Sequence, residues 1–81
     1  MVILSGHAIN QAKERKISPK KIVSAIENPT KVLSQGDNRY KAVKLTRRRN
    51  KKYLLVVVYD AIDSVKEVVT AFVTSKINKY L

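Results

Sequence analysis

The stretch KLTRRRNKKYLLVVVY, residues 44–59, decides the fold. Its second half, Tyr53 to Tyr59, is an unbroken apolar run of seven residues, which suits a buried β-strand and is far too short to span a membrane as a helix. The middle of the stretch, RRRNKK at residues 47–52, places five cations within six residues and predicts an exposed hairpin loop. We therefore expect a central strand that follows a strongly basic hairpin.

Three more strands are expected around this central strand. Residues 39–46 alternate as a strand does, with a slip at Ala42-Val43 that suggests a β-bulge. Residues 30–34 form a shorter strand before the turn sequence GDN at residues 36–38, and residues 67–74 form a strand after a turn at residues 60–66. The tail, residues 75–81, is expected to be a short helix or an extra edge strand.

Two helices precede the strands. The first begins with Ser5 as its N-cap and runs to about residue 15 or 16. The second has Ser18 as its N-cap and Pro19 in its first turn, and Asn28-Pro29 ends it because the residue before a proline avoids helical geometry. This order predicts an α+β fold, with two N-terminal helices packed on one face of a four-stranded antiparallel sheet. At 81 residues the chain is expected to be a single domain, residues 1–81.

The composition excludes several classes of protein. The chain has no cysteine, so it holds neither a disulfide framework nor a thiolate zinc site. A single histidine and six acidic residues make a metal site unexpected, and no cofactor is expected. The opening MVIL is too short for a signal sequence. These features favour a cytoplasmic protein that has no membrane partner.

The positive charge of the chain is large and concentrated. Seventeen lysines and arginines against six acids give a formal net charge of +11, which favours a polyanionic partner. No acid occurs between residues 38 and 59, and this stretch supplies the predicted nucleic-acid-binding residues: Arg39, Lys41, Lys44, Arg47, Arg48, Arg49, Lys51 and Lys52. Nucleic acid, RNA before DNA, is the favoured partner. An acidic protein could use the same surface, and lysines at a sheet edge also discourage aggregation. A small domain of this kind could also form a homodimer through a sheet edge.

The only histidine, His7, lies at the expected start of the first helix. A neutral imidazole suits general-base catalysis, and RNA cleavage through the 2′-OH also needs a cation for the phosphate and an acid for the leaving oxygen. Arg15 follows His7 on one side of the helix, and Lys76, Lys79 and Tyr80 in the tail are candidate acids. The alternative is a histidine that caps, packs or hydrogen-bonds without catalysing anything.

The segment HAINQAKERKIS, residues 7–18, resembles the H-A-x-x-R-x-x-x-R-G-I-S opening of a family of small bacterial and archaeal domains. The stretches AIENPTKV, RYKAVK, YLLVVVYD and VVTAFVTSKINKYL match the layout of the same family. These domains are similar to BrnT toxins and, more distantly, to the RelE/ParE superfamily, whose ribonuclease members cut mRNA and are neutralised by antitoxins. The resemblance implies a RelE/ParE-like fold, metal-independent endoribonuclease activity and an acidic antitoxin-like partner.

The resemblance also implies site residues. His7 and Arg15 match the opening, whereas Gln11 replaces its first arginine and Lys16 replaces its glycine. The tail SKINKY resembles the C-terminal arrangement of these toxins, so Lys76 and Tyr80 are the implied partners of His7. Three hypotheses follow: a toxin-like ribonuclease using His7, Arg15, Lys76 and Tyr80, a nucleic-acid-binding module without catalysis, and a module that binds an acidic protein.

Overall fold

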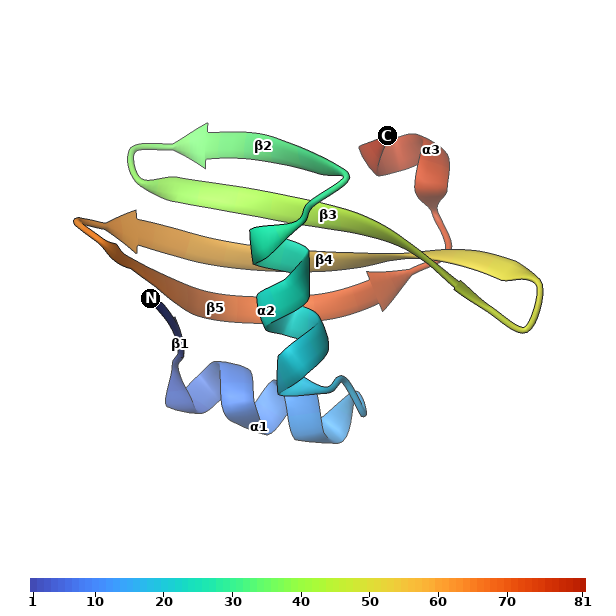
Figure 1. Cartoon of the computed structure of the whole chain (residues 1–81), viewed down its shortest axis with the longest axis horizontal. Coiled ribbons are helices and arrows are strands. Elements are labelled where there is room, and N and C mark those ends of the chain that lie inside the picture. The colour runs from blue at the N-terminus through green and yellow to red at the C-terminus, as the bar shows by residue number, and fades with distance from the viewer.

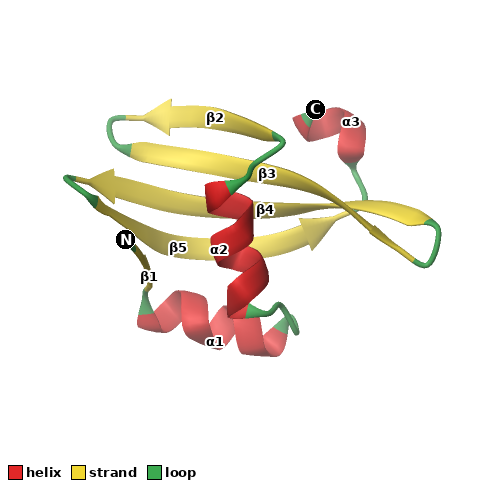
Figure 2. Ribbon diagram, viewed as in Figure 1, coloured by secondary structure: helices red, strands yellow, loops and turns green.

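A computed structural model describes all residues, 1–81, as five strands and three helices. A twisted sheet forms the body of the domain (Figures 1 and 2). Helix α2 crosses one face of the sheet, α1 lies along its β5 side, and α3 is a short helix that follows the end of β5. The elements in chain order are β1 (Val2–Leu4), α1 (Gly6–Glu14), α2 (Pro19–Glu27), β2 (Lys31–Gly36), β3 (Arg39–Arg48), β4 (Lys51–Ile62), β5 (Val65–Thr74) and α3 (Ile77–Tyr80).

The domain is α+β, but the predicted four-stranded antiparallel sheet with two helices is wrong. The sheet has five strands in the order β1-β5-β4-β3-β2, and β1 pairs with β5 in parallel, so the sheet is mixed. β1 was missed because three residues carry no measurable alternation. The β1–β5 pairing uses the start of the chain, since the Lys66 N–H donates to the Met1 carbonyl at 2.8 Å and the Ser5 N–H donates to the Val68 carbonyl at 3.2 Å.

The strands run further than their sequence pattern indicates. β3 and β4 pair without interruption from Arg39–Asp60 to Arg48–Lys51, so the basic loop shrinks to a two-residue turn and the bulge expected at Ala42-Val43 is absent. Register shifts occur instead where Val58 and Tyr59 face β5, and between Ser34 and Gly36 in β2. The stretch expected to turn the chain, residues 60–66, belongs mostly to strands and leaves a turn only at 63–64.

The helix boundaries follow local capping chemistry. The Ser5 hydroxyl accepts a hydrogen bond from the Ala8 N–H at 3.1 Å, and the Ser18 hydroxyl accepts one from the Lys20 N–H at 3.2 Å. Helix α2 ends at Glu27, two residues before Pro29, as predicted. Both longer helices have nine residues. A helix needs about 20 apolar residues to span a bilayer, and none of the three helices has this length and composition.

The sheet has a hydrophobic layer on each face. On one face α1 and α2 bury Ala12 and Ile22 against alternate residues of β4, including Leu55 and Val57. On the other face Val43, Leu54 and Val56 form a smaller cluster. Phe72 of β5 and two residues of α3, Ile77 and Tyr80, pack against it. Because neighbouring residues in a strand point to opposite faces, α3 packs on the side of the sheet opposite to the main core.

The β3–β4 hairpin extends beyond the helices. A nine-residue helix is about 14 Å long, whereas a ten-residue strand is about 34 Å long. The long axis of the molecule is 38 Å, and the far end of the hairpin projects past both α1 and α2 (Figure 1). Because the strands are longer than the helices, residues near the tip of the hairpin that face the helix side of the sheet are not covered by a helix. The candidate site lies at this uncovered part of the sheet.

Candidate nucleic-acid interface

A pocket of about 450 Å³ lies where the hairpin passes the helices. Its apolar side is formed by Ile17, Tyr53, Leu55 and Val73. Six cations line the same pocket, and we call this set of ten residues the basic pocket: Ile17, Tyr53, Leu55 and Val73 with Arg15, Lys16, Lys21, Lys44, Arg47 and Arg48. Ser24 and Thr46 complete the lining, and no acidic residue contributes to it.

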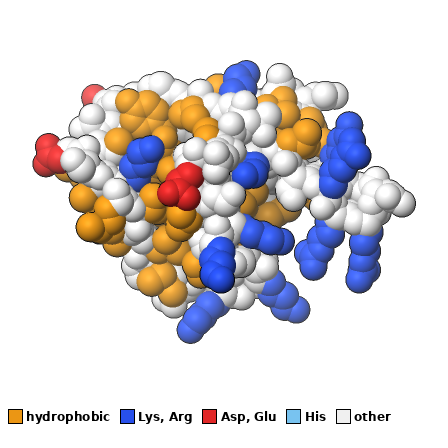
Figure 3. Space-filling model, in the orientation of Figure 1, with side chains coloured by type: hydrophobic (Ala, Val, Ile, Leu, Met, Phe, Trp, Pro, Cys, Tyr) orange, Lys and Arg blue, Asp and Glu red, His pale blue; other side chains and the backbone are white.

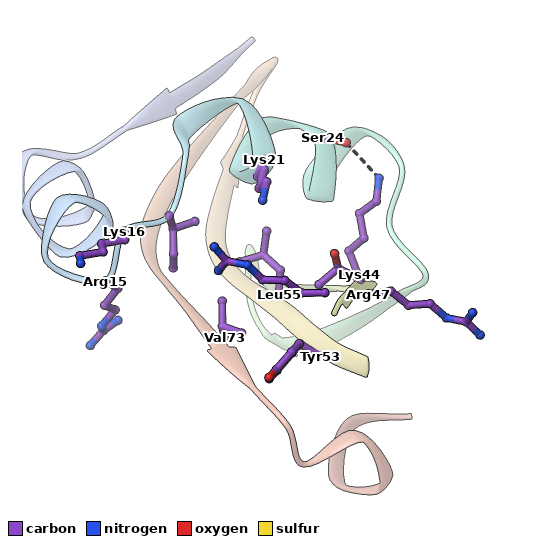
Figure 4. Close-up of a pocket in the computed structure, with 12 residues that line it drawn as sticks. Arg15, Lys16, Lys21, Ser24, Lys44, Arg47, Tyr53, Leu55 and Val73 are labelled. Atoms are coloured by element: carbon purple, nitrogen blue, oxygen red, sulfur yellow. Dashed lines mark hydrogen bonds between the residues drawn. The ribbon is translucent and has the colours of Figure 1, made fainter. Parts of the chain in front are cut away.

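The apolar floor of the pocket follows from the register of the sheet. Leu55 pairs with Lys44 on β3 and with Val73 on β5, and Tyr53 pairs with Thr46. These five side chains therefore lie on the face that carries α2. Figure 4 shows Tyr53 and Val73 side by side along the floor, with Lys21 pointing toward them from α2.

Lys44 ties the two walls of the pocket together. Its Nζ donates a hydrogen bond of 2.9 Å to the Ser24 hydroxyl on α2 (Figure 4). The ammonium thereby gains a neutral acceptor and keeps its charge unpaired. In the same view Arg47 extends outward from the rim of the pocket. On the hairpin side of the pocket, Lys44 is thus held by a hydrogen bond, whereas Arg47 points away from it.

The end of α1 contributes two cations in different ways. Arg15 Nη1 donates a hydrogen bond to the Ala71 carbonyl at 2.7 Å. Ala71 lies in the part of β5 that extends past its pairing with β1, so Arg15 supplies this carbonyl with a hydrogen-bond partner. The same nitrogen approaches the hydroxyl of Thr70 at 3.5 Å, and Thr70 is also hydrogen-bonded to Gln11. Lys16 follows with a φ of 56°, a left-handed conformation that is uncommon for lysine.

Positive charge gathers on the part of the molecule that carries the pocket. Figure 3 shows lysine and arginine side chains over the hairpin end, where no acidic side chain is visible, and the acidic side chains in this view lie near the middle and toward the opposite end. The chain has one ion pair, in which Arg39 Nε and Asp60 Oδ1 are 2.7 Å apart. Its hydrogen bond raises the pKa of Arg39 and lowers the pKa of Asp60. This pair lies at the other end of β3 and β4.

The predicted binding residues fall into three groups. Lys44, Arg47 and Arg48 line the basic pocket. Three others, Arg49, Lys51 and Lys52, are exposed at the tip of the same hairpin. The last two are placed elsewhere.

Arg39 is neutralised by Asp60, and Lys41 lies on the opposite face, where its Nζ is 5.4 Å from the centre of the Tyr80 ring. The predicted basic stretch therefore does not form one surface. Strand alternation sends Lys41 and Lys44 to different faces, and the long β3–β4 ladder carries Arg39 to the distant end.

The four predicted catalytic residues do not converge. His7 is exposed in the first turn of α1 and makes no side-chain hydrogen bond, and Arg15 is held against the β5 backbone. Lys76 and Tyr80 belong to the α3 region, where Tyr80 packs with Phe72 over the opposite face of the sheet. Neither the basic pocket nor the hollow beside the Arg39–Asp60 pair is lined by His7, Lys76 or Tyr80.

Sequence reasoning missed two pocket cations, Lys16 and Lys21. Both lie well before the basic hairpin in the chain, so a search for runs of charge does not connect them with it. One local signal exists for Lys16. It follows the end of a helix and precedes Ile-Ser, at a position where glycine is the usual residue.

Comparison with known proteins places the chain in a family. A domain of unknown function (DUF4258) matches residues 4–73. The match includes every residue that lines the basic pocket and ends before α3, which carries Tyr80 and follows Lys76. No curated protein matches the chain, and no solved structure matches it. Because the matched residues make up more than four fifths of the sequence, this protein belongs to the DUF4258 family.

Proposed function

We propose that the protein is a non-catalytic RNA-binding module that holds the phosphate backbone in the basic pocket. One observation carries this proposal: six cations, from the segment just after α1, from α2 and from the hairpin, surround one hollow, and no carboxylate lies among them.

The charge arrangement supports an anionic ligand on physical grounds. Cations that are brought together repel one another, and none of the six pocket cations forms an ion pair that would relieve this repulsion. A chain of phosphates relieves it and releases the counterions condensed on the nucleic acid, which makes binding favourable and strongly dependent on salt. A surface evolved only for solubility would intersperse acids with these cations.

Ribonuclease activity is not part of this proposal. Cleavage through the 2′-OH needs a base, an acid and a cation at one phosphate, and these groups must lie within hydrogen-bond reach of it. His7 and Tyr80 lie on elements that pack on different parts of the sheet. A toxin-like role, an acidic antitoxin-like partner and a cytoplasmic location remain predictions from the sequence.

The proposal is tested by measuring RNA affinity as a function of salt concentration. We expect the logarithm of the association constant to fall linearly with the logarithm of salt. Replacing one phosphate-contacting cation, as in Lys21→Gln, should make the slope shallower by about 0.7 for a single strand. Lys31→Gln is the matched control, since Lys31 is an exposed lysine on β2 outside the pocket. The proposal fails if RNA does not bind, or if both variants change the slope equally.

A further inference from the structure

We propose that the basic pocket receives an unpaired nucleobase of single-stranded RNA and holds the neighbouring phosphates on its rim. This inference rests on the proposed function and adds the form of the ligand. It starts from a feature that phosphate binding leaves unexplained, namely an apolar floor beneath the cations.

The floor has the chemistry that a nucleobase needs. Leu55 is 5% exposed and gives a firm apolar base, and Val73 and Tyr53 extend it toward the open side of the pocket. Val73 is 50% exposed, although it is a large apolar residue beside the core. A planar base laid on Tyr53 and Val73 would remove this apolar surface from water, and aromatic side chains are common stacking platforms for bases.

The size and rim of the pocket fit a single nucleotide unit. A hollow of about 450 Å³ falls in the range of small-molecule sites. Lys21 approaches from α2, whereas Arg48 approaches from the hairpin, so cations flank the floor on two sides. A base on the floor would thus have a cation available for the phosphate before it and for the phosphate after it.

A double helix does not fit the same arrangement. Paired bases are stacked inside the duplex, and the major groove of A-form RNA is too narrow for side chains to reach them. The duplex would offer the pocket only phosphates, and the apolar floor would stay exposed to water. A single strand can turn one base out and use both parts of the pocket.

The experiment compares three probes on the wild-type protein at one salt concentration. The probes are a single-stranded RNA about ten nucleotides long, a ribose-phosphate strand of the same length without bases, and a blunt duplex of the same RNA. We expect the single-stranded RNA to bind about tenfold more tightly than the strand without bases. Equal affinities for all three probes would overturn the inference.

Two variants locate the base. Tyr53→Leu keeps an apolar side chain but removes the ring, and Tyr53→Phe keeps the ring. We expect Tyr53→Leu to lower the affinity for single-stranded RNA about tenfold and to leave the strand without bases unaffected, with Tyr53→Phe close to wild type. An equal loss on both probes would contradict the inference. Circular dichroism checks that each variant is folded.

The outcomes separate this inference from the proposed function. If all three probes bind equally and with steep salt dependence, phosphate binding stands and the base pocket is rejected. If no probe binds, both are rejected. The comparison of probes needs no variant, so the inference can be tested even if Tyr53→Leu does not fold.

Discussion

The Ile17 N–H donates to the Ala12 carbonyl at 2.8 Å, and this bond closes the end of α1. The Lys16 N–H donates to the Lys13 carbonyl at 3.2 Å, and the two bonds together form a Schellman motif. This motif requires a left-handed conformation at Lys16. Glycine adopts this conformation without steric cost, whereas other L-residues are disfavoured by about 1 kcal/mol. Lys16 therefore has a strained backbone conformation, and its side chain lines the basic pocket.

Lys16→Gly should change stability and binding in opposite directions. Relief of the left-handed strain should raise the free energy of unfolding, by up to about 1 kcal/mol. Loss of the charge should weaken RNA binding severalfold. Urea unfolding and RNA titration measure the two effects. Lys16→Ala is the control, since it removes the same charge, retains the strain and should weaken binding without a gain in stability. Wild-type affinity in both variants would show that Lys16 does not contact RNA.

Arg39 and Arg48 should differ in their contribution to binding, although both lie on β3 within the basic stretch. Arg48 lines the pocket, whereas Arg39 is paired with Asp60 at the other end of the strand. We expect Arg48→Gln to lower RNA affinity and Arg39→Gln to leave it unchanged. Titration of the same RNA with both variants checks this. A larger loss from Arg39→Gln would mean that RNA binds elsewhere on the sheet.

The Arg39–Asp60 pair should make stability depend on pH on the acid side. The hydrogen bond from Arg39 lowers the folded-state pKa of Asp60 below its ordinary value of about 3.8. Its stabilising effect is therefore fully present above that value and is lost as the pH falls through the lower, folded-state pKa. Asp60→Asn should abolish this part of the pH dependence, as measured by urea unfolding from neutral pH downward. Asp63→Asn removes an acid without an ion pair and should retain it.

His7→Ala should leave RNA affinity unchanged. The His7 side chain is exposed, makes no hydrogen bond and does not line the basic pocket. Tyr80→Phe is expected to behave in the same way, because Tyr80 lies with α3 on the opposite face of the sheet. Incubation of both variants and wild type with RNA tests cleavage in the same samples. Cleavage by wild type that both substitutions abolish would restore the catalytic hypothesis and contradict the placement of these residues.

The sequence predicted the parts of the fold that depend on local chemistry. Ser5 and Ser18 mark the starts of their helices because their hydroxyls accept hydrogen bonds from backbone N–H groups of the first turn. Asn28-Pro29 ends α2 because the proline ring clashes with a helical conformation of the residue before it. The central position of Tyr53–Tyr59 follows from its apolar run. β1 was not predicted because its three residues form a strand only through their pairing with β5, which is distant in the sequence. Local patterns do not reveal such long-range pairing.

The candidate site was predicted in part, for a related reason. The hairpin cations are adjacent in sequence and therefore visible, whereas Lys16 and Lys21 reach the pocket only when α1 and α2 fold over the sheet. The tail could turn to either face after β5, and Ile77 and Tyr80 hold it away from His7 because they pack against the smaller hydrophobic cluster, on the face opposite to α1 and α2. A four-residue helix carries too little periodic signal to indicate this choice.

The central claim is most directly tested by two triple variants with the same net charge. One replaces the pocket residues Lys21, Arg47 and Arg48 with glutamine, and the other replaces Lys31, Lys66 and Lys79, which lie outside the pocket. RNA affinity is measured for both over a range of salt concentrations. We predict that only the pocket variant loses most of its affinity and has a markedly shallower salt slope. Equal losses in the two variants would contradict the account, because binding would then follow net charge and not the basic pocket.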